Sequence, residues 1–369
     1  MRYYRARLGL TATLSFLMFV LAAGYLSIHG INALEGRNPY QFFADANTYH
    51  EFARSMNQFA GSELISLGRN ALGPLFLVLL SGDNYYLVAA LNVLIFFISV
   101  RLLSWDARVD PLFFAALLLL NPMTISSLMA ANKEILSLFF FALLVRAWLR
   151  RSLLWLTLAV VVAICVRWQL FAFVVLLMPF ALGWRLPPHN RALLLVAVAV
   201  ALSIAYRLAL GALSQITDNF QAAAQTYSGG SGLFTALVAM QMDGLYFLIA
   251  PIKAAHLLFG LGLRFDRLVT PVDIYNDVWQ LLGSTALLCI FLALCAKRTF
   301  TIRNDVIFIS ILYILLFALS PIYAPRYFYI VYVMWILVYC IHRQRTKSPP
   351  IHDIHDMRPC VGRDCATGQ

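Results

Sequence analysis

The sequence has few charged residues, no disulfide pattern and none of the short motifs of several common soluble enzymes. Charged residues make up only 12% of its 369 residues. It contains no glycine-rich phosphate loop, no HExxH helix and no GxSxG turn, so ATP hydrolysis and zinc proteolysis find no support. Its six cysteines are scattered through apolar runs and a polar tail, which argues against a disulfide framework. No internal repeat of the kind that transporters carry is visible.

Apolar residues dominate what is present. Hydrophobic residues make up 62% of the chain, and the mean hydropathy is +0.78. Repeated apolar runs of about 20 residues are typical of transmembrane helices. The sequence therefore predicts an all-α polytopic membrane protein with about 10–12 transmembrane helices, in a single bundle over residues 1–347. The polar tail, residues 348–369, is predicted to be disordered and cytoplasmic.

The basic residues predict how the bundle is oriented. The net charge of +11 does not indicate nucleic acid binding, because arginine and lysine fall in short clusters between apolar runs, as the positive-inside rule expects. Arg2, Arg5 and Arg7 precede the first run and place the N-terminus in the cytoplasm. That run is long and lacks a cleavage site, so we interpret it as a retained anchor. The last run also ends in a basic cluster, which predicts that both termini are cytoplasmic.

The apolar runs give ten predicted spans and one ambiguous region. An extracytoplasmic first loop is expected to carry an interfacial helix over residues 46–60, with Asp45 as a suitable N-cap. Residues 71–82 are apolar but too short to cross a membrane, and residues 234–274 contribute either two spans or none. The outer loops are predicted at 29–70, 211–233 and 253–277. The spans are predicted at 8–28, 85–104, 111–130, 135–149, 192–210, 278–296, 305–320 and 328–341, with a hairpin over 152–184 that turns at Arg167.

Three basic residues lie on the face that the positive-inside rule depletes of them. Lys133, Arg167 and Arg326 each sit in a short turn between apolar helices. A lysine or arginine at membrane depth costs roughly 2.5–3.5 kcal/mol on insertion scales. Snorkelling to the outer headgroups is one explanation for the arginines. The other is a shared anionic ligand, the phosphate or pyrophosphate of a lipid-linked substrate, held by charge-assisted hydrogen bonds.

The outer acidic and aromatic residues also carry two interpretations each. Asp45 is either a helix cap or a general base that takes a proton from an attacking hydroxyl. Glu134 either complements the dipole of the returning helix or orients a substrate group. His50 and Glu51 are loop residues or have acid–base or sugar-binding roles, and Tyr327 is a membrane-belt aromatic or a sugar platform. The tail holds His352, His355, Cys360 and Cys365, which resemble metal spacing only weakly, so no metal site is predicted.

These segments together resemble the bacterial multi-spanning glycosyltransferases of the GT-C type and their polysaccharide-polymerase relatives. The resemblance rests on short motifs spread over residues 9–345: Asp45-Ala-Asn47-Thr-Tyr49, Asn121-Pro122, Asn132-Lys133-Glu134, Arg167 and Pro325-Arg326-Tyr327. It implies a protein of the bacterial inner membrane with a sugar donor linked to a polyprenyl phosphate or diphosphate, and it carries the role of base or acceptor anchor to Asp45. It further implies that Lys133, Arg167 and Arg326 take the lipid phosphate and that Glu134 orients Lys133 or a sugar hydroxyl. The family often has a second acidic residue where this chain has Asn47, so no cation is predicted to be required and a divalent cation is left open.

The resemblance implies an integral-membrane glycosyltransferase that acts at the periplasmic face in cell-surface polysaccharide synthesis. Its partners would be a polyprenyl-linked sugar donor, a glycan acceptor, membrane lipid and other polysaccharide-assembly proteins. A repeat-unit polymerase for O-antigen or exopolysaccharide, and a flippase for a lipid-linked glycan, remain alternatives. Asp45 is the predicted catalytic residue. The predicted substrate-binding residues are Asn47, Tyr49, His50, Glu51, Lys133, Glu134, Arg167, Arg326 and Tyr327.

Overall fold

The computed structural model describes most of the chain, and every regular element in that part is a helix. It describes residues 15, 18, 44–55, 61–181, 186–212, 232–260, 280–321 and 325–347. The predicted first span, the polar tail and much of the predicted outer loops lie outside these residues. The helices are α2 (Ala44–Ser55), α3 (Gly61–Leu80), α4 (Tyr85–Asp106), α5 (Pro111–Leu119), α6 (Pro122–Met129), α7 (Lys133–Arg150), α8 (Leu153–Val166), α9 (Trp168–Ala181), α10 (Pro188–Ala212), α12 (Gly232–Met242), α13 (Tyr246–Phe259), α15 (Gln280–Ala296), α16 (Asp305–Phe317), the 3-10 helix η4 (Pro325–Phe328) and α17 (Tyr329–Lys347).

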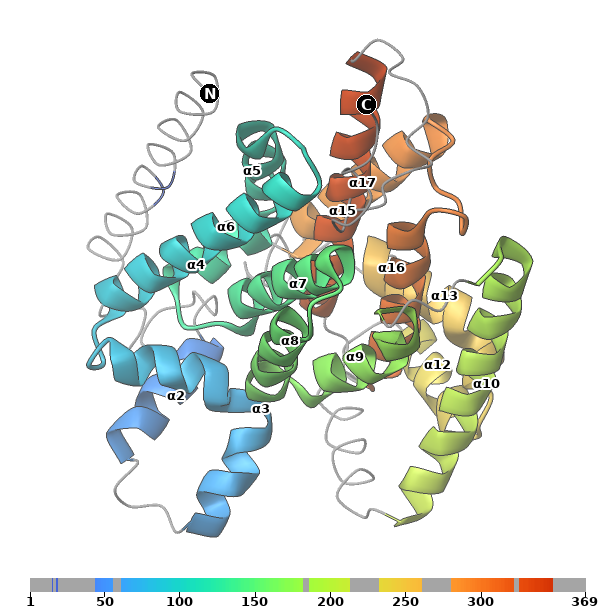
Figure 1. Cartoon of the computed structure of the whole chain (residues 1–369). Coiled ribbons are helices and arrows are strands. Elements are labelled where there is room, and N and C mark those ends of the chain that lie inside the picture. The colour runs from blue at the N-terminus through green and yellow to red at the C-terminus, as the bar shows by residue number, and fades with distance from the viewer. Residues whose placement is uncertain are drawn as a thin grey trace, which may run out of the picture.

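Helix α17 is the centre of the bundle. Its residues from Tyr329 to Val338 are all buried, and it packs against α5, α7, α15 and α16 (Figure 1). A helix that is apolar on all sides can be buried on all sides, and the few polar groups of α17 find partners inside. The Trp335 indole donates to the Ser310 hydroxyl at 2.9 Å, and the Tyr332 hydroxyl donates to the Leu117 carbonyl at 2.7 Å.

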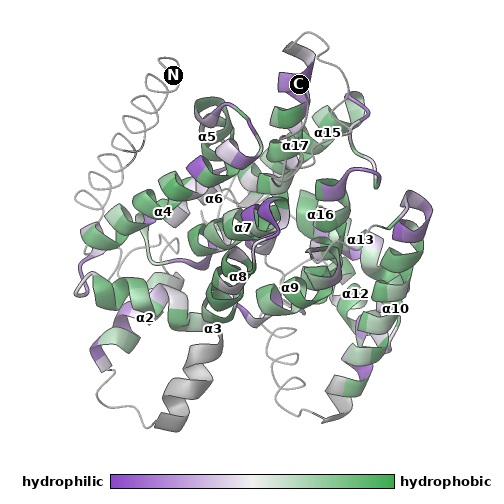
Figure 2. Cartoon of the chain, viewed as in Figure 1, coloured by the Kyte–Doolittle hydropathy of each residue, from purple (hydrophilic) through white to green (hydrophobic). Residues whose placement is uncertain are grey.

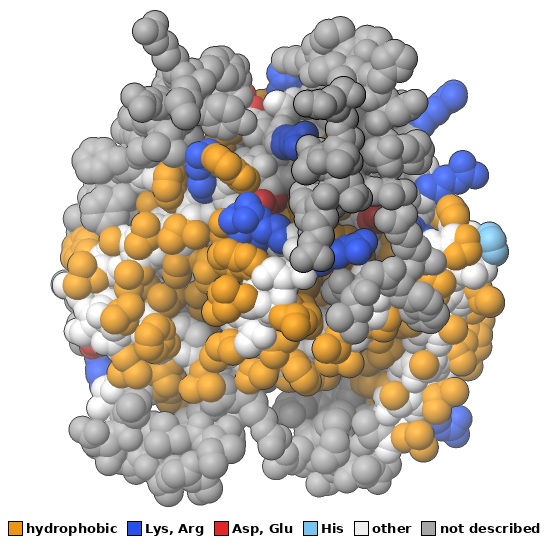
Figure 3. Space-filling model, viewed as in Figure 1, with side chains coloured by type: hydrophobic (Ala, Val, Ile, Leu, Met, Phe, Trp, Pro, Cys, Tyr) orange, Lys and Arg blue, Asp and Glu red, His pale blue; other side chains and the backbone are white. Residues whose placement is uncertain are grey.

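The outer helices expose apolar side chains as a membrane protein does. Phe76, Leu153 and Leu193 are each more than 60% exposed, and Figure 3 shows hydrophobic side chains spread as a broad belt around this face. Hydrophilic residues instead gather at helix ends and turns (Figure 2). Soluble monomers rarely expose apolar surface on this scale. The chain is therefore an α-helical protein whose surface suits a membrane.

Three of the described helices are long and apolar enough to cross a membrane, or four if a bent pair is counted as one span. The three are Tyr85–Asp106, Pro188–Leu208 and the region Pro325–Thr346, and they agree with predicted spans at 85–104, 192–210 and 328–341. Further apolar helices of 10–17 residues fall short of the roughly 20 residues that a straight crossing needs. The predicted total of ten to twelve spans stays a prediction.

The bent pair is α5 and α6, and it differs from the single span predicted at 111–130. The two helices meet at 89°. Pro122 lacks the N–H that would continue the helix, and the Asn121 side chain caps α6 by accepting from the Met123 N–H at 2.9 Å. The Thr124 hydroxyl donates to the Leu118 carbonyl at 2.6 Å, which adds a side-chain hydrogen bond across the bend to an oxygen that also accepts from the Asn121 N–H at 3.2 Å.

The remaining elements match the predictions with shifted ends. The predicted hairpin at 152–184 is α8 and α9 with Arg167 between them, and the predicted interfacial helix is α2, which starts at Ala44. Residues 71–82, predicted as a short piece, mostly belong to the 20-residue helix α3. The ambiguous region contains a pair of short helices, α12 and α13. Helix α13 continues to Phe259 with Lys253 and His256 buried, so residues 253–259 are helical where an outer loop over 253–277 was predicted.

Several helices run between two ends of different character. Residues at one end, which we call the arginine-rich end, include Arg146, Arg150, Arg191, Arg303 and Arg345. Residues at the other, which we call the Glu134 end, include Lys133, Glu134, Arg167, Arg326 and Tyr327. Helix α7 has 18 residues, so at 1.5 Å per residue the two ends are about 26 Å apart, close to the thickness of a bilayer core.

Candidate functional site

A buried ion pair anchors the Glu134 end. The Arg167 Nη2 donates to the Glu134 Oε1 at 2.7 Å, and the side chains are only 6% and 2% exposed. Asn132 caps α7 and its side chain accepts from the Glu134 N–H at 3.2 Å, so Glu134 sits in the first turn, where the helix dipole favours a carboxylate. Arg167 lies in an extended conformation at the break between α8 and α9. The pair therefore joins α7 to the α8–α9 turn.

Tyr327 lies beside two arginines. The Arg167 guanidinium carbon is 4.5 Å from the centre of the Tyr327 ring, and the Arg326 guanidinium carbon is 6.0 Å from it. A guanidinium within about 6 Å of an aromatic ring is attracted to the ring face. The Tyr313 hydroxyl of α16 donates to the Tyr327 carbonyl at 3.0 Å and fixes the backbone of η4. Two cationic groups are thus held on one aromatic residue, and one of them, Arg167, is paired with the Glu134 carboxylate.

Lys133 extends this group of residues toward α2. Its Nζ lies 6.0 Å from the centre of the buried Tyr49 ring, and Lys133 itself is half-buried. Helix α2 begins at Ala44, so Asp45 is in its first turn rather than in the position before it. Residues four apart lie on one face of a helix, which places Asp45 one turn before Tyr49 on that face. The side chains of Asp45 and Asn47 lie outside those the structure describes.

The structure thus brings six of the ten predicted site residues into one connected group at the Glu134 end. Backbone adjacency joins Lys133 to Glu134 and Tyr327 to Arg326, and the contacts given above join the rest. We call this group the Glu134 cluster: Tyr49, Lys133, Glu134, Arg167, Arg326 and Tyr327. The predicted role of Glu134 in orienting Lys133 differs from what is seen, because its carboxylate binds Arg167. Arg167 is buried and paired, whereas Lys133 and Arg326 are partly exposed.

His50 and Glu51 have other surroundings. Glu51 is exposed on α2. The His50 Nδ1 lies 2.5 Å from the Asp83 Oδ1, and the Arg54 Nε donates to the Asp83 Oδ2 at 2.7 Å. The His50 ring packs on Tyr85, with centroids 3.9 Å apart. These contacts tie α2 to the turn between α3 and α4, so in this structure His50 positions the helix that carries Asp45.

Burial and hydrogen bonding determine the ionisation of His50 and Asp83. Burial lowers the pKa of His50 below its usual value and outweighs the opposite effect of the nearby Asp83 carboxylate. For Asp83, burial opposes ionisation, but the hydrogen bonds from Arg54 and His50 outweigh it and lower the pKa below its usual value. Asp83 is therefore the anion of the group and His50 is neutral at neutral pH. The Gly82-Asp83-Asn84 turn was the sequence signal for this partner, and sequence reasoning missed it.

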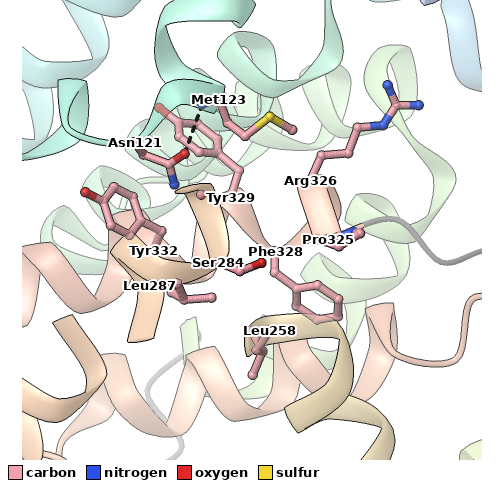
Figure 4. A pocket seen from close by; sticks show the side chains of 11 residues that line it. Asn121, Met123, Leu258, Ser284, Leu287, Pro325, Arg326, Phe328, Tyr329 and Tyr332 are labelled. Carbon is pink, nitrogen blue, oxygen red and sulfur yellow. Dashed lines mark hydrogen bonds between the residues drawn. The ribbon is translucent and has the colours of Figure 1, made fainter. Parts of the chain in front are cut away.

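A narrow cleft lies under η4. It is lined by Asn121 and Met123 of the α5–α6 bend, Ser284 of α15, and Arg326 and Tyr329 (Figure 4). It holds about 20 Å³, which is room for little more than one water molecule. The Arg326 guanidinium points away from Ser284 and Leu258 in Figure 4. The cleft therefore brings together the Asn121 and Arg326 segments that the resemblance named, but as found here it cannot hold a sugar.

A second polar group inside the bundle was not predicted. The fully buried Lys253 of α13 donates to the Gln241 side chain and, at 2.8 Å, to the Ser320 carbonyl. The signal for it is a lysine in the middle of an apolar helix, which requires partners. Those partners come from α12 and from the end of α16, so Lys253 holds three segments together near η4.

Neither metals nor relatives identify the site further. Among the residues that the structure describes, no three His, Cys, Asp or Glu side chains gather as metal ligands would. The prediction from the sequence, that no cation is required and that a divalent cation is possible, therefore stays a prediction. Comparison of the chain with family models, with curated proteins and with solved structures found no match.

Proposed function

We propose that the protein is an integral-membrane glycosyltransferase, which moves a sugar or oligosaccharide from a polyprenyl-(di)phosphate-linked donor to an acceptor hydroxyl at the periplasmic face. One observation supports it above others. Residues from four separate segments, all predicted from the sequence to bind a lipid-linked substrate, lie together as the Glu134 cluster, at the end of α7 opposite Arg146 and Arg150. A purely structural role for each residue would not require them to converge.

In this proposal the acceptor oxygen attacks the anomeric carbon of the donor sugar, and the bond from that carbon to the phosphate oxygen breaks. The acceptor proton passes to the Asp45 carboxylate, and the lipid phosphate leaves as an anion. Lys133 and Arg326, which are partly exposed, stabilise the charge that grows on the phosphate. Arg167 is held by Glu134 at 2.7 Å, so it adds positive potential and fixes Tyr327.

The test is the product made by a deletion strain that carries variants of the gene. Asp45→Asn removes the base and keeps the size of the side chain, and Asp243→Asn makes the same change in the turn between α12 and α13, at a residue that is not a member of the Glu134 cluster. We expect loss of polymer with the first variant and normal polymer with the second at equal protein levels. Normal polymer from Asp45→Asn would remove Asp45 from the mechanism.

The lipid-linked material in the deletion strain distinguishes the alternatives. Truncated repeat units indicate a transferase, and single complete units indicate a polymerase. Purified protein in liposomes that moves labelled lipid-linked glycan without making a glycosidic bond indicates a flippase and contradicts the proposal. Replacing Lys133 and Arg326 together by glutamine should weaken binding of the phosphate-bearing donor whether the protein is a transferase or a polymerase, because both cations are lost.

A further inference from the structure

A cavity of about 440 Å³ opens at the arginine-rich end, far from the Glu134 cluster. This volume lies within the range of small-molecule sites. Its walls are apolar and come from four helices that are distant in sequence, with Phe141 and Trp148 on α7, Leu177 on α9, Ile309 on α16 and Ile341 on α17. An apolar chamber of this size at one end of a membrane bundle suits hydrocarbon chains.

The mouth of this cavity carries a surplus of positive charge. Arg108, Arg303 and Arg345 line it. In the part of the chain that the structure describes, their guanidinium groups make no hydrogen bond, ion pair or ring contact. The two acidic lining residues are already paired. Asp106 accepts from Arg146 at 3.2 Å and has Arg150 at 3.5 Å, and Asp305 accepts from Arg191 at 2.6 Å.

The backbone at Arg108 determines which substitution tests this site. Its φ is +54°, in the left-handed region that favours glycine. Arg151 and Arg298 have a positive φ as well, so the strain is not itself evidence of a ligand, but it makes glycine a well-tolerated replacement for Arg108. Figure 3 shows lysine and arginine side chains mainly on the upper part of this face, above the apolar belt.

The geometry points to a binding site for an anionic phospholipid, with its phosphate between Arg108, Arg303 and Arg345 and its acyl chains against the walls formed by α7, α9, α16 and α17. Guanidinium groups bind phosphate oxygens in bidentate fashion. The apolar walls add contacts for acyl chains, which a free anion such as inorganic phosphate lacks. This site is independent of the proposed transfer reaction, because it lies about one bilayer thickness from the Glu134 cluster.

The test compares two arginines that share the same backbone strain. Arg108→Gly removes a guanidinium from the mouth and relieves a left-handed residue. Arg151→Gly also removes a guanidinium and places glycine at a positive φ, +48°, but Arg151 lies at the C-terminus of α7, outside the cavity lining. Both variants should fold, because glycine suits both positions. Full-length protein in detergent is titrated with phosphatidylglycerol, phosphatidylcholine of the same chains, or inorganic phosphate, and bound lipid is counted by native mass spectrometry.

We expect phosphatidylglycerol to bind more tightly than phosphatidylcholine, and Arg108→Gly to weaken it about five- to tenfold while Arg151→Gly leaves it unchanged. Inorganic phosphate should not displace the lipid. Equal affinities of the two glycine variants, or of the two lipids, would overturn the inference. Displacement by inorganic phosphate would also overturn it, because it would assign the arginines to a free anion. A combined Arg303→Gln and Arg345→Gln variant should weaken binding further.

Discussion

The Glu134–Arg167 pair offers the sharpest test of the structure, because removing one partner should lower the unfolding free energy much more than removing both. Both side chains are almost completely buried. Replacing Arg167 by methionine keeps a long side chain but leaves the Glu134 carboxylate buried without its cation. Breaking a buried pair in this way costs roughly 3–5 kcal/mol of unfolding free energy. The contact with the Tyr327 ring is lost as well, at about 1–2 kcal/mol when desolvated.

Removing both charges should cost much less. A Glu134→Leu, Arg167→Met double variant replaces the pair by apolar side chains, and such replacements are often neutral or stabilising. We therefore expect the double variant to be more stable than Arg167→Met alone, with a coupling energy of about 2 kcal/mol or more. Unfolding of the purified protein in mixed micelles, followed by circular dichroism, measures each variant.

A pair at the other end serves as the control. Arg146→Met breaks the contact with Asp106, but Arg150 remains 3.5 Å from the same carboxylate. Its cost should be smaller than that of Arg167→Met, because the Asp106 carboxylate keeps a cationic partner while a ring contact is lost in both variants, that of Arg146 with Trp155 at 4.6 Å and that of Arg167 with Tyr327. If the effects of Glu134→Leu and Arg167→Met simply add, or if Arg167→Met costs no more than Arg146→Met, the two side chains do not form the buried pair described above.

Three further predictions concern other contacts. Because burial lowers the pKa of His50 below its usual value of 6.5, the unfolded state binds a proton first as the pH falls through that value. Stability should therefore decrease there, and His50→Gln should remove this decrease. The part due to Asp83, whose pKa is also lowered, is lost at lower pH, from the usual carboxyl range downward. Gly73→Ala should destabilise the protein, because a Cβ would lie 2.9 Å from Leu136, and thermal unfolding in detergent should show a lower midpoint. Tyr313→Phe should cost about 1 kcal/mol in micelle unfolding, for one lost hydrogen bond.

The sequence was sufficient to predict the elements whose signals are local. A long apolar run interrupted by Arg167-Trp168-Gln169 indicates a hairpin, and α8 and α9 turn there. The bend after Leu119 has an equally local cause in Asn121-Pro122. It was missed because the apolar run over 111–130 has the length of a span, and length was given more weight than the cap and the proline.

Partners across the bundle could not be predicted in the same way. Sequence reasoning placed Glu134 and Arg167 on the same face but could not show that they bind each other, because their contact depends on how α7 packs against α8. The same holds for His50, whose partner Asp83 comes from a turn 33 residues away. The partners of Lys253 could not be predicted either, since Gln241 and Ser320 reach it only once α12, α13 and the end of α16 are packed.

Helix α7 connects the two regions that the proposals concern. Its first residues are Lys133 and Glu134, and near its last turn Arg146 and Arg150 hold Asp106 beside the apolar chamber. A helix is stiff along its axis, so a ligand that displaces one end of α7 lengthwise displaces the other end by a similar distance. If both proposals hold, lipid bound in the apolar chamber would in this way shift the charged groups at the other end of α7 without any domain movement.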